Sequence, residues 1–314
     1  MTPQLIRPPL REVRSRIFDS ARWDDYAPRA DDILIATYPK CGTTWTQRIV
    51  SMLVAASAAP APIVSPWYDF RLMPPGVAHA MAEALTTRRI LKTHLPFDAV
   101  PVYAGVKVIH VARDGRDSAM SFHNHMLGFR PEPLARLKEI SRTDPKFGDD
   151  LPPTPDDPAA FFREWLDDDG GARGDPACSY FHVEPSYWAA RREPDMLLVH
   201  FNDLKADREA EIRRIAAFLG IEVPAEAWPA IAEAAGFETM RAQGDEILPQ
   251  MQMTWDEGAR RFLHKGTNER WRGVVSEADL EAYAQAVRER LAPGLARWLE
   301  GGRRATGDPA LLDD

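Results

Sequence analysis

The chain has 314 residues and a formal net charge of −8, with 45% hydrophobic and 27% charged residues. These values predict a globular protein and argue against a general nucleic-acid-binding surface, which would be basic. Two cysteines, Cys41 and Cys178, are too few for a disulfide framework or a metal cluster. The N-terminus lacks the apolar core of a signal peptide, and the longest apolar stretch, 49–64, is too short to span a bilayer and contains prolines. We therefore expect a cytoplasmic enzyme.

Strands and helices are predicted to alternate along the chain. In chain order they are a strand at 33–38, a helix at 44–56, a short strand within 88–97, a strand at 106–113, a helix from about Asp117, a strand at 195–204 and a helix at 207–221. This alternation predicts an α/β fold: one domain over 1–314, its core at about 30–280, with a central parallel sheet flanked by helices. The proline-rich segments 58–80 and 130–162 are predicted as irregular loops, and the C-terminal "GGRRATGDPALLDD" as frayed.

The segment "YPKCGTTW" (38–45) links the first strand to its helix. A strand, a tight turn and a helix N-terminus form an anion site, because free backbone N–H groups and the helix dipole both favour a phosphate. Gly42 lets the backbone approach a ligand, Thr43 and Thr44 add hydroxyl donors, and Lys40 adds a charge. The turn is therefore P-loop-like, although an ordinary strand–helix turn has a similar composition. The ATP-binding pattern G-x-x-x-x-G-K-[ST] is absent, which argues against a nucleoside triphosphatase.

Two further segments suit a second phosphate. In "VIHVARDGRDSAMSFHNHM" (108–126), Arg113 stands at the carboxyl end of a strand, where open α/β sheets bind ligands, and Ser121 follows in the next helix. In "FLHKGTNERWRG" (262–273), Lys265 and Gly266 lie in a polar loop. Each is also compatible with an ordinary surface position.

The strand segment "LKTHLP" (91–96) carries the candidate base. Lys92 and His94 are two residues apart, so their side chains project from the same face of a strand. A histidine beside a cationic phosphate site could act as a general base on a hydroxyl, and the alternative is a structural histidine. His123 and His125 are also two apart, but on a helix they do not share a face, so a metal pair is not expected.

Taken together, "YPKCGTTW", "KTHLP", "VARDGRDSAMS" and "FLHKGTNERWRG" resemble the motifs of the soluble, cytosolic-type sulfotransferases, in a bacterial branch, over residues 30–280. The resemblance implies that the donor is 3′-phosphoadenylyl sulfate (PAPS), that the nucleotide product is adenosine 3′,5′-bisphosphate (PAP), and that no metal takes part. His94 would deprotonate the acceptor hydroxyl, while Lys40 and Lys92 would neutralise charge on the transferring sulfuryl group and the leaving phosphate.

The same resemblance implies a set of donor-binding residues. The phosphosulfate loop would comprise 40–44, Trp45 and Phe237 would contact adenine, and Arg113 and Ser121 would bind the 3′-phosphate with help from 265–266. The whole set is Lys40, Cys41, Gly42, Thr43, Thr44, Trp45, Arg113, Ser121, Phe201, Phe237, Phe262, Leu263, His264, Lys265 and Gly266.

Four residues depart from the family pattern. Cys41 replaces a serine and, beside Lys40, could be a reactive thiol; Phe201 replaces a tyrosine, Ala235 a threonine, and His264 an arginine. The family's dimer motif, K-x-x-x-T-V-x-x-x-E, survives only as "RGVVSEADLE", which leaves monomer and homodimer both open.

The acceptor is expected to be a small molecule with a hydroxyl group. Its pocket would be lined by apolar side chains, which could equally belong to the core: Trp67, Tyr68, Phe70, Met73, Phe129, Phe147, Met251, Met253 and Trp255. Such a wall favours a phenolic, lipidic or steroid-like hydroxyl over a bare sugar. Two other functions stay open at this point, a P-loop-like nucleotide kinase and a non-catalytic nucleotide-binding relative.

Overall fold

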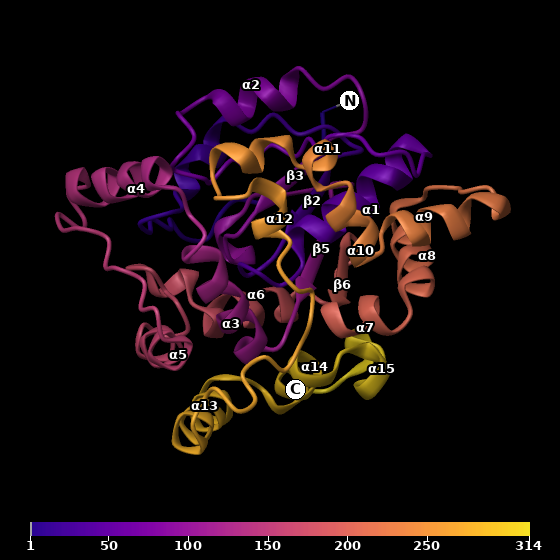
Figure 1. Cartoon of the computed structure of the whole chain (residues 1–314). Coiled ribbons are helices and arrows are strands. Elements are labelled where there is room, and N and C mark those ends of the chain that lie inside the picture. The colour runs from indigo at the N-terminus through magenta and orange to yellow at the C-terminus, as the bar shows by residue number, and fades with distance from the viewer. Residues whose placement is uncertain (1) are drawn as a thin grey trace.

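The computed structural model describes residues 2–314, and at its centre lies a four-stranded parallel sheet (Figure 1). The strands stand in the order β3-β2-β5-β6, with every neighbouring pair parallel. Their bounds are β2 Ile33–Ala36, β3 Ile90–Thr93, β5 Lys107–Ala112 and β6 Met196–His200. The predicted α/β fold with a central parallel sheet is confirmed.

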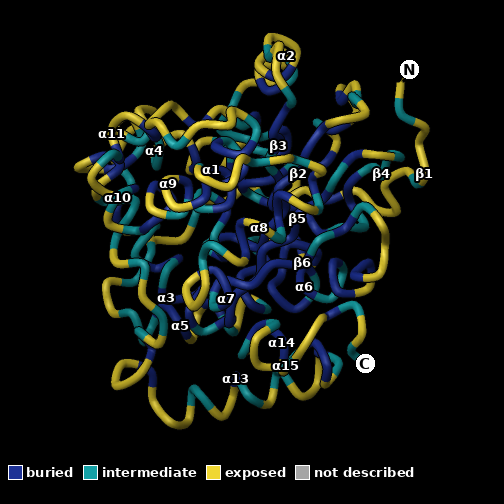
Figure 2. Tube along the Cα trace, turned by 90° about the vertical axis from the view of Figure 1, so that its right-hand side faces the viewer, coloured by how far each residue is buried: buried dark blue, intermediate teal, exposed yellow. Residues whose placement is uncertain are grey.

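Alternation along each strand produces two apolar layers. In β2, Ile33 and Ile35 belong to the core that holds α1 (Thr43–Ala55) and α8 (Arg208–Leu219). Leu34 and Ala36 belong to the opposite core, with α6 (Tyr180–Ala189). The sheet is therefore covered on both faces, and Figure 2 shows it as the buried centre of the molecule, with the exposed residues at the periphery.

The remaining helices surround this core. They are α2 Val77–Glu83, α3 Gly115–Met126, α4 Pro131–Thr143, α5 Pro158–Asp167, α7 Phe201–Ala206, α9 Trp228–Ala234, α10 Phe237–Ala242, α11 Gly244–Ile247, α12 Gly258–Phe262, α13 Glu277–Arg290, α14 Pro293–Gly301 and α15 Arg303–Thr306. A small antiparallel pair joins β1 Leu5–Arg7 to β4 Val102–Tyr103. Both figures place α2 and α13 at opposite ends of the molecule.

The strand order fixes where a ligand can bind. The strand that follows β2 in the chain, β3, lies on one side of it, and the strand that follows β5, β6, lies on the other side of the sheet. The connections that leave the carboxyl ends of the neighbouring strands β2 and β5 therefore run in opposite directions. In open α/β sheets the crevice at such a switch point, at the carboxyl ends of the strands, is the usual binding site. The turn 37–42 and Arg113 both lie there.

Two of the predicted elements are wrong in part. The strand predicted at 195–204 ends at His200, because the His200 ring accepts a hydrogen bond from the Asn202 N–H and caps α7. The segment 130–162, predicted as irregular, contains α4 and the start of α5. Both helices begin with proline, whose missing N–H is not needed in a first turn.

The C-terminal segment is docked rather than frayed, so that prediction is wrong. The Arg191 guanidinium donates to the Pro309 and Leu312 carbonyls, and the Trp188 indole donates to Asp314. These contacts tie the last residues to α6. Within residues 2–314, no helix combines the length and the apolar character that crossing a bilayer requires.

Candidate functional site

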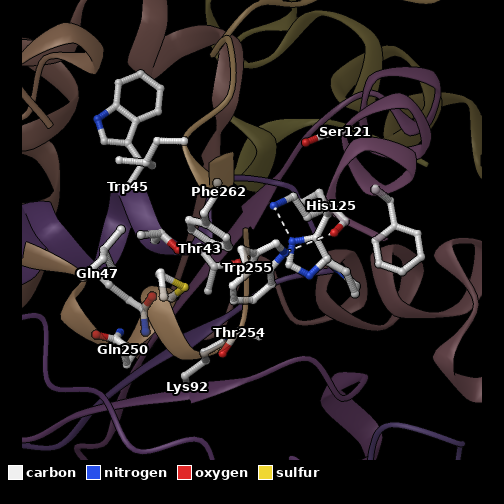
Figure 3. Close-up of a pocket in the computed structure, with 18 of the residues that line it drawn as sticks. Thr43, Trp45, Gln47, Lys92, Ser121, His125, Gln250, Thr254, Trp255 and Phe262 are labelled. Carbon is white, nitrogen blue, oxygen red and sulfur yellow. Dashed lines mark hydrogen bonds between the residues drawn. The ribbon is translucent and has the colours of Figure 1, made fainter. Parts of the chain in front are cut away.

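A cavity of about 1160 Å³ lies over the carboxyl ends of the strands. Every predicted donor-binding and catalytic residue except Cys41 lines it. Figure 3 shows how distant segments meet there: Thr43 and Trp45 come from α1, Lys92 from β3, and Ser121 and His125 from α3. Trp255 precedes α12, and Phe262 is the last residue of that helix. The four motifs of the sequence therefore surround one space.

The wall of this cavity is strongly cationic although the chain is acidic. Nine lining residues are lysine or arginine, and Glu132 is the one acidic residue among them, against a formal charge of −8 for the whole chain. A concave wall of one sign focuses its field into the space it encloses. The cavity is therefore suited to a ligand with several negative charges.

The turn after β2 presents a bare helix N-terminus to the cavity. Gly42 is the N-cap of α1 and has φ 119°, a left-handed conformation that glycine adopts without strain. A Cβ at this position would lie 3.2 Å from the Phe201 ring. Side chains make no capping hydrogen bond here, and the Thr43 hydroxyl lies 2.7 Å from that of Thr37. The free N–H groups of this 13-residue helix are thus left for an anion.

Lys40 extends from this turn into the cavity, and none of the carboxylates in residues 2–314 forms an ion pair with it. Its Nζ lies 3.3 Å from Nδ1 of His125 and 4.6 Å from the centre of the Phe262 ring. Burial, and then the charges of Lys92 and Arg113, lower the pKa of Lys40 to about 7. This ammonium group therefore loses its proton near neutral pH in the free protein.

His94 follows β3 and has the protonation state that a base needs. Its Nδ1 lies 2.7 Å from the Thr37 carbonyl oxygen, so Nδ1 carries the proton and donates it, and the lone pair sits on Nε2. Burial, and then the charge of Lys92, hold the pKa of His94 well below its usual value. The rings of Phe18 and Trp67 lie 5.7 and 4.9 Å away and keep water from the imidazole.

Lys92 lies over the indole of Trp67, with its Nζ 3.6 Å from the ring centre. Burial lowers the pKa of Lys92 to about 8, and nearby Asp69 opposes that shift. The buried Asp69 carboxylate accepts hydrogen bonds from the indoles of Trp23 and Trp67 and from the His94 backbone N–H. It therefore orients the wall around His94 and Lys92.

Arg113, at the end of β5, is held by neutral groups. It donates to the Thr267 carbonyl at 3.0 Å and to the Asn268 side-chain oxygen at 2.8 Å, and it stacks 4.1 Å from the Phe201 ring centre. Within residues 2–314 no carboxylate forms an ion pair with it, and burial lowers its pKa. Ser121 lies further along the same wall.

The segment 262–266 lines the cavity where the donor nucleotide is expected. Gly266 has φ 61°, and a Cβ there would collide with the Phe237 ring at 2.5 Å, so this turn packs directly on that ring. Burial and the charges of Arg270 and Lys265 lower the pKa of His264 to about 4. His264 is therefore neutral at pH 7 in the free protein, unlike the arginine that the family pattern has.

Trp45 and Phe201 form the adjoining aromatic wall. The Trp45 indole donates to the Ala235 carbonyl at 2.8 Å, and its ring meets that of Phe201 edge-on at 5.3 Å. Residue 235 thus contributes its backbone oxygen to this contact, and alanine supplies that oxygen as well as threonine does.

Cys41 faces the core rather than the cavity. Its Sγ is fully buried, 3.2 Å from the Ser118 hydroxyl, and burial raises its pKa. These observations oppose the reactive-thiol alternative.

Most of the predicted acceptor residues share the cavity with the donor residues. Those that line it are Trp67, Phe70, Met73, Phe129, Met251, Met253 and Trp255. Tyr68 does not, because its ring stacks on Trp23 in the core, and Phe147 packs instead against Arg16 and the turn at Gly174.

The lining residues that the sequence did not identify include Phe18, His125, Arg173 and Arg270. His125 stands four residues after Ser121 on α3, a spacing that places both on one helix face and that could have identified it. Arg270 lies inside the quoted segment "FLHKGTNERWRG". Nothing in the local sequence connects Phe18 or Arg173 with the site.

The fold and this cavity are those of an α/β transferase with a P-loop-like turn. The sulfotransferase domain family matches residues 30–294. Glycolipid sulfotransferases of Mycobacterium bovis and Mycobacterium tuberculosis are 30% and 31% identical to this chain, each over 95% of it and 96% of the relative. Sulfotransferase 1A1 of Canis lupus familiaris is 26% identical, over 90% of this chain and 92% of the relative. The chain belongs to the sulfotransferase family, as its motifs predicted.

Solved structures agree on the fold. Mouse sulfotransferase SULT7A1 complexed with PAP aligns with a TM-score of 0.66 at 20% identity, over 89% of this chain and 92% of that one. Retinol dehydratase in a complex with retinol and PAP gives 0.66 at 22% identity, over 88% and 87%. In residues 2–314, histidine, cysteine and acidic side chains do not gather into a group of three that could hold a metal ion.

Proposed function

We propose that this sulfotransferase transfers the sulfuryl group of PAPS to a hydroxyl of a small apolar, aromatic or lipidic acceptor, with His94 as general base. The observation that carries the proposal is the state of His94: its Nδ1 donates to the Thr37 carbonyl, and its Nε2 has no hydrogen-bond partner within residues 2–314. Lys40 and Lys92, which form no ion pair in that part of the chain, line the same cavity. A neutral imidazole with a free nitrogen is the form that accepts a proton from a hydroxyl.

The donor fits the cationic part of the cavity. Its phosphosulfate would lie over the N-terminus of α1, with Lys40 and Lys92 beside it. The 3′-phosphate would lie between Arg113, Ser121 and the turn 265–266, and adenine against Trp45 and Phe237. PAP is present in the related structures named above, which supports this assignment.

The reaction is a displacement at sulfur. His94 Nε2 takes the hydroxyl proton, the acceptor oxygen forms a bond to sulfur, and the bond from sulfur to the 5′-phosphate oxygen breaks. The products are the acceptor sulfate ester and PAP, with the proton left on His94. Charge builds on the bridging oxygen in the transition state, and Lys40 and Lys92 are placed to stabilise it.

The apolar wall supports an apolar acceptor. The rings of Phe129 and Trp255, both in the cavity wall, form a tilted pair with their centres 4.9 Å apart. The relatives named glycolipid sulfotransferases agree with a lipidic acceptor. A nucleotide kinase is the alternative, and a thermal shift with PAP but not with ADP would separate the two.

His94→Ala tests the base. We expect turnover to fall by roughly 10²–10⁴-fold, because general-base catalysis of this kind contributes that factor. Affinity for PAP, measured by calorimetry, should stay near that of the parent, since His94 contacts the acceptor. The assay is sulfate transfer to a panel of phenols and glycolipids. Near-parental turnover in the variant would remove His94 from the mechanism.

A further inference from the structure

Arg173 is a charged side chain in the cavity wall to which the mechanism above assigns no role. Its guanidinium carbon lies 3.6 Å from the centre of the Phe122 ring on α3, and the Phe122 ring stacks toward His125 at 6.0 Å. His125 in turn contacts Lys40. Arg173 is therefore linked through two aromatic rings to the reaction centre.

The backbone at Arg173 is fixed on both sides. Its N–H donates to the Asp168 carboxylate at 2.9 Å, and its carbonyl accepts from the Arg16 N–H at 3.2 Å. Its φ is 55°, a conformation that non-glycine residues adopt at a cost, within a turn whose neighbours Gly171 and Gly174 also have positive φ. An arginine thus stands where the backbone favours glycine, and its side chain is held in place.

The guanidinium forms no ion pair with a carboxylate within residues 2–314. Burial lowers the pKa of Arg173, while the Tyr38 hydroxyl and Asp168, which accepts from the Arg173 backbone N–H, oppose that shift as its electrostatic neighbours in the fold. Nε and Nη2 are buried without a hydrogen-bond partner. Buried polar groups in folded proteins are normally satisfied, and a buried charge is normally paired. A ligand is the partner that this arrangement lacks.

The position of Arg173 favours the acceptor over the donor. The Arg16–Phe18 segment that binds its carbonyl also places Phe18 against His94, so Arg173 flanks the side from which the hydroxyl approaches. The charge of Arg173 lowers the pKa of His94 and of His125, in agreement with that placement. The donor phosphates already have partners in the α1 N-terminus, Lys40 and Arg113.

We infer that Arg173 binds an anionic group of the acceptor, a carboxylate, sulfate or phosphate carried on the same molecule as the hydroxyl presented to His94. This inference rests on the proposed function, because it assumes that the acceptor occupies this side of the cavity. The enzyme would then select amphipathic acceptors with an apolar body and one negative charge.

The test compares acceptors that differ only in charge. Isomers of hydroxy-2-naphthoate are assayed against the corresponding hydroxy-2-naphthamides with the parent, Arg173→Gln and Arg173→Lys. Arg297→Gln is the control, since Arg297 is exposed and forms no ion pair or side-chain hydrogen bond within residues 2–314. Calorimetry with 2-naphthoate and 2-naphthamide in the presence of PAP measures binding without turnover.

For the best carboxylate isomer we expect Arg173→Gln to lower kcat/KM by roughly 10–100-fold, the usual value of a charged hydrogen bond. The amide should change little, Arg173→Lys should restore part of the loss, and 2-naphthoate binding should weaken in parallel. Equal losses for amide and carboxylate would place Arg173 on the sulfuryl group and overturn the inference, as would a loss of PAP affinity or no change at all. Failure of the proposed function differs, because then no acceptor of either charge is sulfated by the parent.

Discussion

At the residue scale, the site is a group of cationic side chains suited to binding an anion. Arg113 is buried in the cavity wall and Lys40 and Lys92 are half-buried there, and desolvation lowers the pKa of each. The sequence identified these three residues through their motifs. It could not show that they lack carboxylate partners, because partners are chosen by the fold and not by spacing along the chain.

The pH dependence of PAP affinity should report on Lys40. The pKa of Lys40 is about 7 in the free protein, and a bound phosphate should raise it by favouring the charged form. Below pH 7 Lys40 is already protonated in the free protein, so PAP affinity does not depend on its titration there. Above pH 7 affinity should fall, by up to about tenfold per pH unit, until the pKa of the complex is passed.

The measurement is calorimetric titration with PAP from about pH 7 to 9, in the parent and in Lys40→Met. Lys92, with a pKa of about 8, adds its own slope to both proteins, so the difference between them isolates Lys40. Parallel curves would show that Lys40 does not bind the nucleotide in its charged form.

Arg270 should compensate for His264 on the donor side. Arg270 lines the cavity, and its charge lowers the pKa of both Arg113 and His264, so the three lie close together. Within residues 2–314 it has no ion pair of its own. We expect Arg270→Gln to weaken PAP affinity by roughly 10–100-fold, as the loss of a charged hydrogen bond does.

The matched control for Arg270→Gln is Arg272→Gln, two residues further on, where the side chain is exposed and paired with Glu269. Its affinity for PAP should equal that of the parent. A similar loss in both variants would indicate a general electrostatic effect instead of a contact at Arg270.

At the scale of elements, the features with local sequence signals were predicted, and the features that depend on contacts between distant residues were missed. The strand–turn–helix units β2–α1 and β5–α3 were predicted, because their apolar runs, glycine and capping residues are local signals. Helix α4 was missed because prolines 131 and 133 suggest a loop, although proline is favoured in a first turn. The approach of the Arg173 turn to the site depends on packing across 130 residues, as in the Tyr38 hydrogen bond to Gly170.

The packing beneath the turn between β2 and α1 predicts the behaviour of Cys41. Both cysteines are buried, and burial raises the pKa of Cys41, so iodoacetamide should inactivate the folded parent only slowly. Cys41→Ser should keep turnover within about threefold of the parent, since it changes one small buried contact with Ser118. Rapid inactivation that the substitution abolishes would mean that this turn opens in solution.

At the scale of the molecule, the distribution of charge opposes stability and favours binding. The chain is acidic overall, yet nine lysines and arginines surround one cavity with a single carboxylate among them. Their mutual repulsion destabilises the empty protein, and a polyanionic nucleotide relieves it. The same field attracts the donor to its site from solution.

Lys40→Met should therefore stabilise the empty protein while reducing its activity. The folded pKa of about 7 lies below the usual value of lysine, so the buried ammonium costs stability fully below pH 7, and this cost vanishes as the pH approaches about 10. At pH 7 we expect the Tm to rise by roughly 1–2 °C for each ~1 kcal/mol of relieved cost, as the unfolding entropy of a 314-residue chain implies. Turnover should fall by roughly 10²-fold or more, as for the loss of one transition-state donor.

Thermal unfolding with and without PAP measures stability and nucleotide binding, and sulfate transfer measures turnover. Lys138→Met on the exposed face of α4 is the control. PAP should raise the Tm of the parent and of Lys138→Met equally, because a ligand that binds only the folded state stabilises by mass action. The shift should be smaller in Lys40→Met, whose binding lacks one cation. If Lys40→Met instead lowers the Tm of the free protein, the Lys40 ammonium group has a stabilising partner in solution. The claim that unpaired cations in the cavity destabilise the free protein would then be wrong.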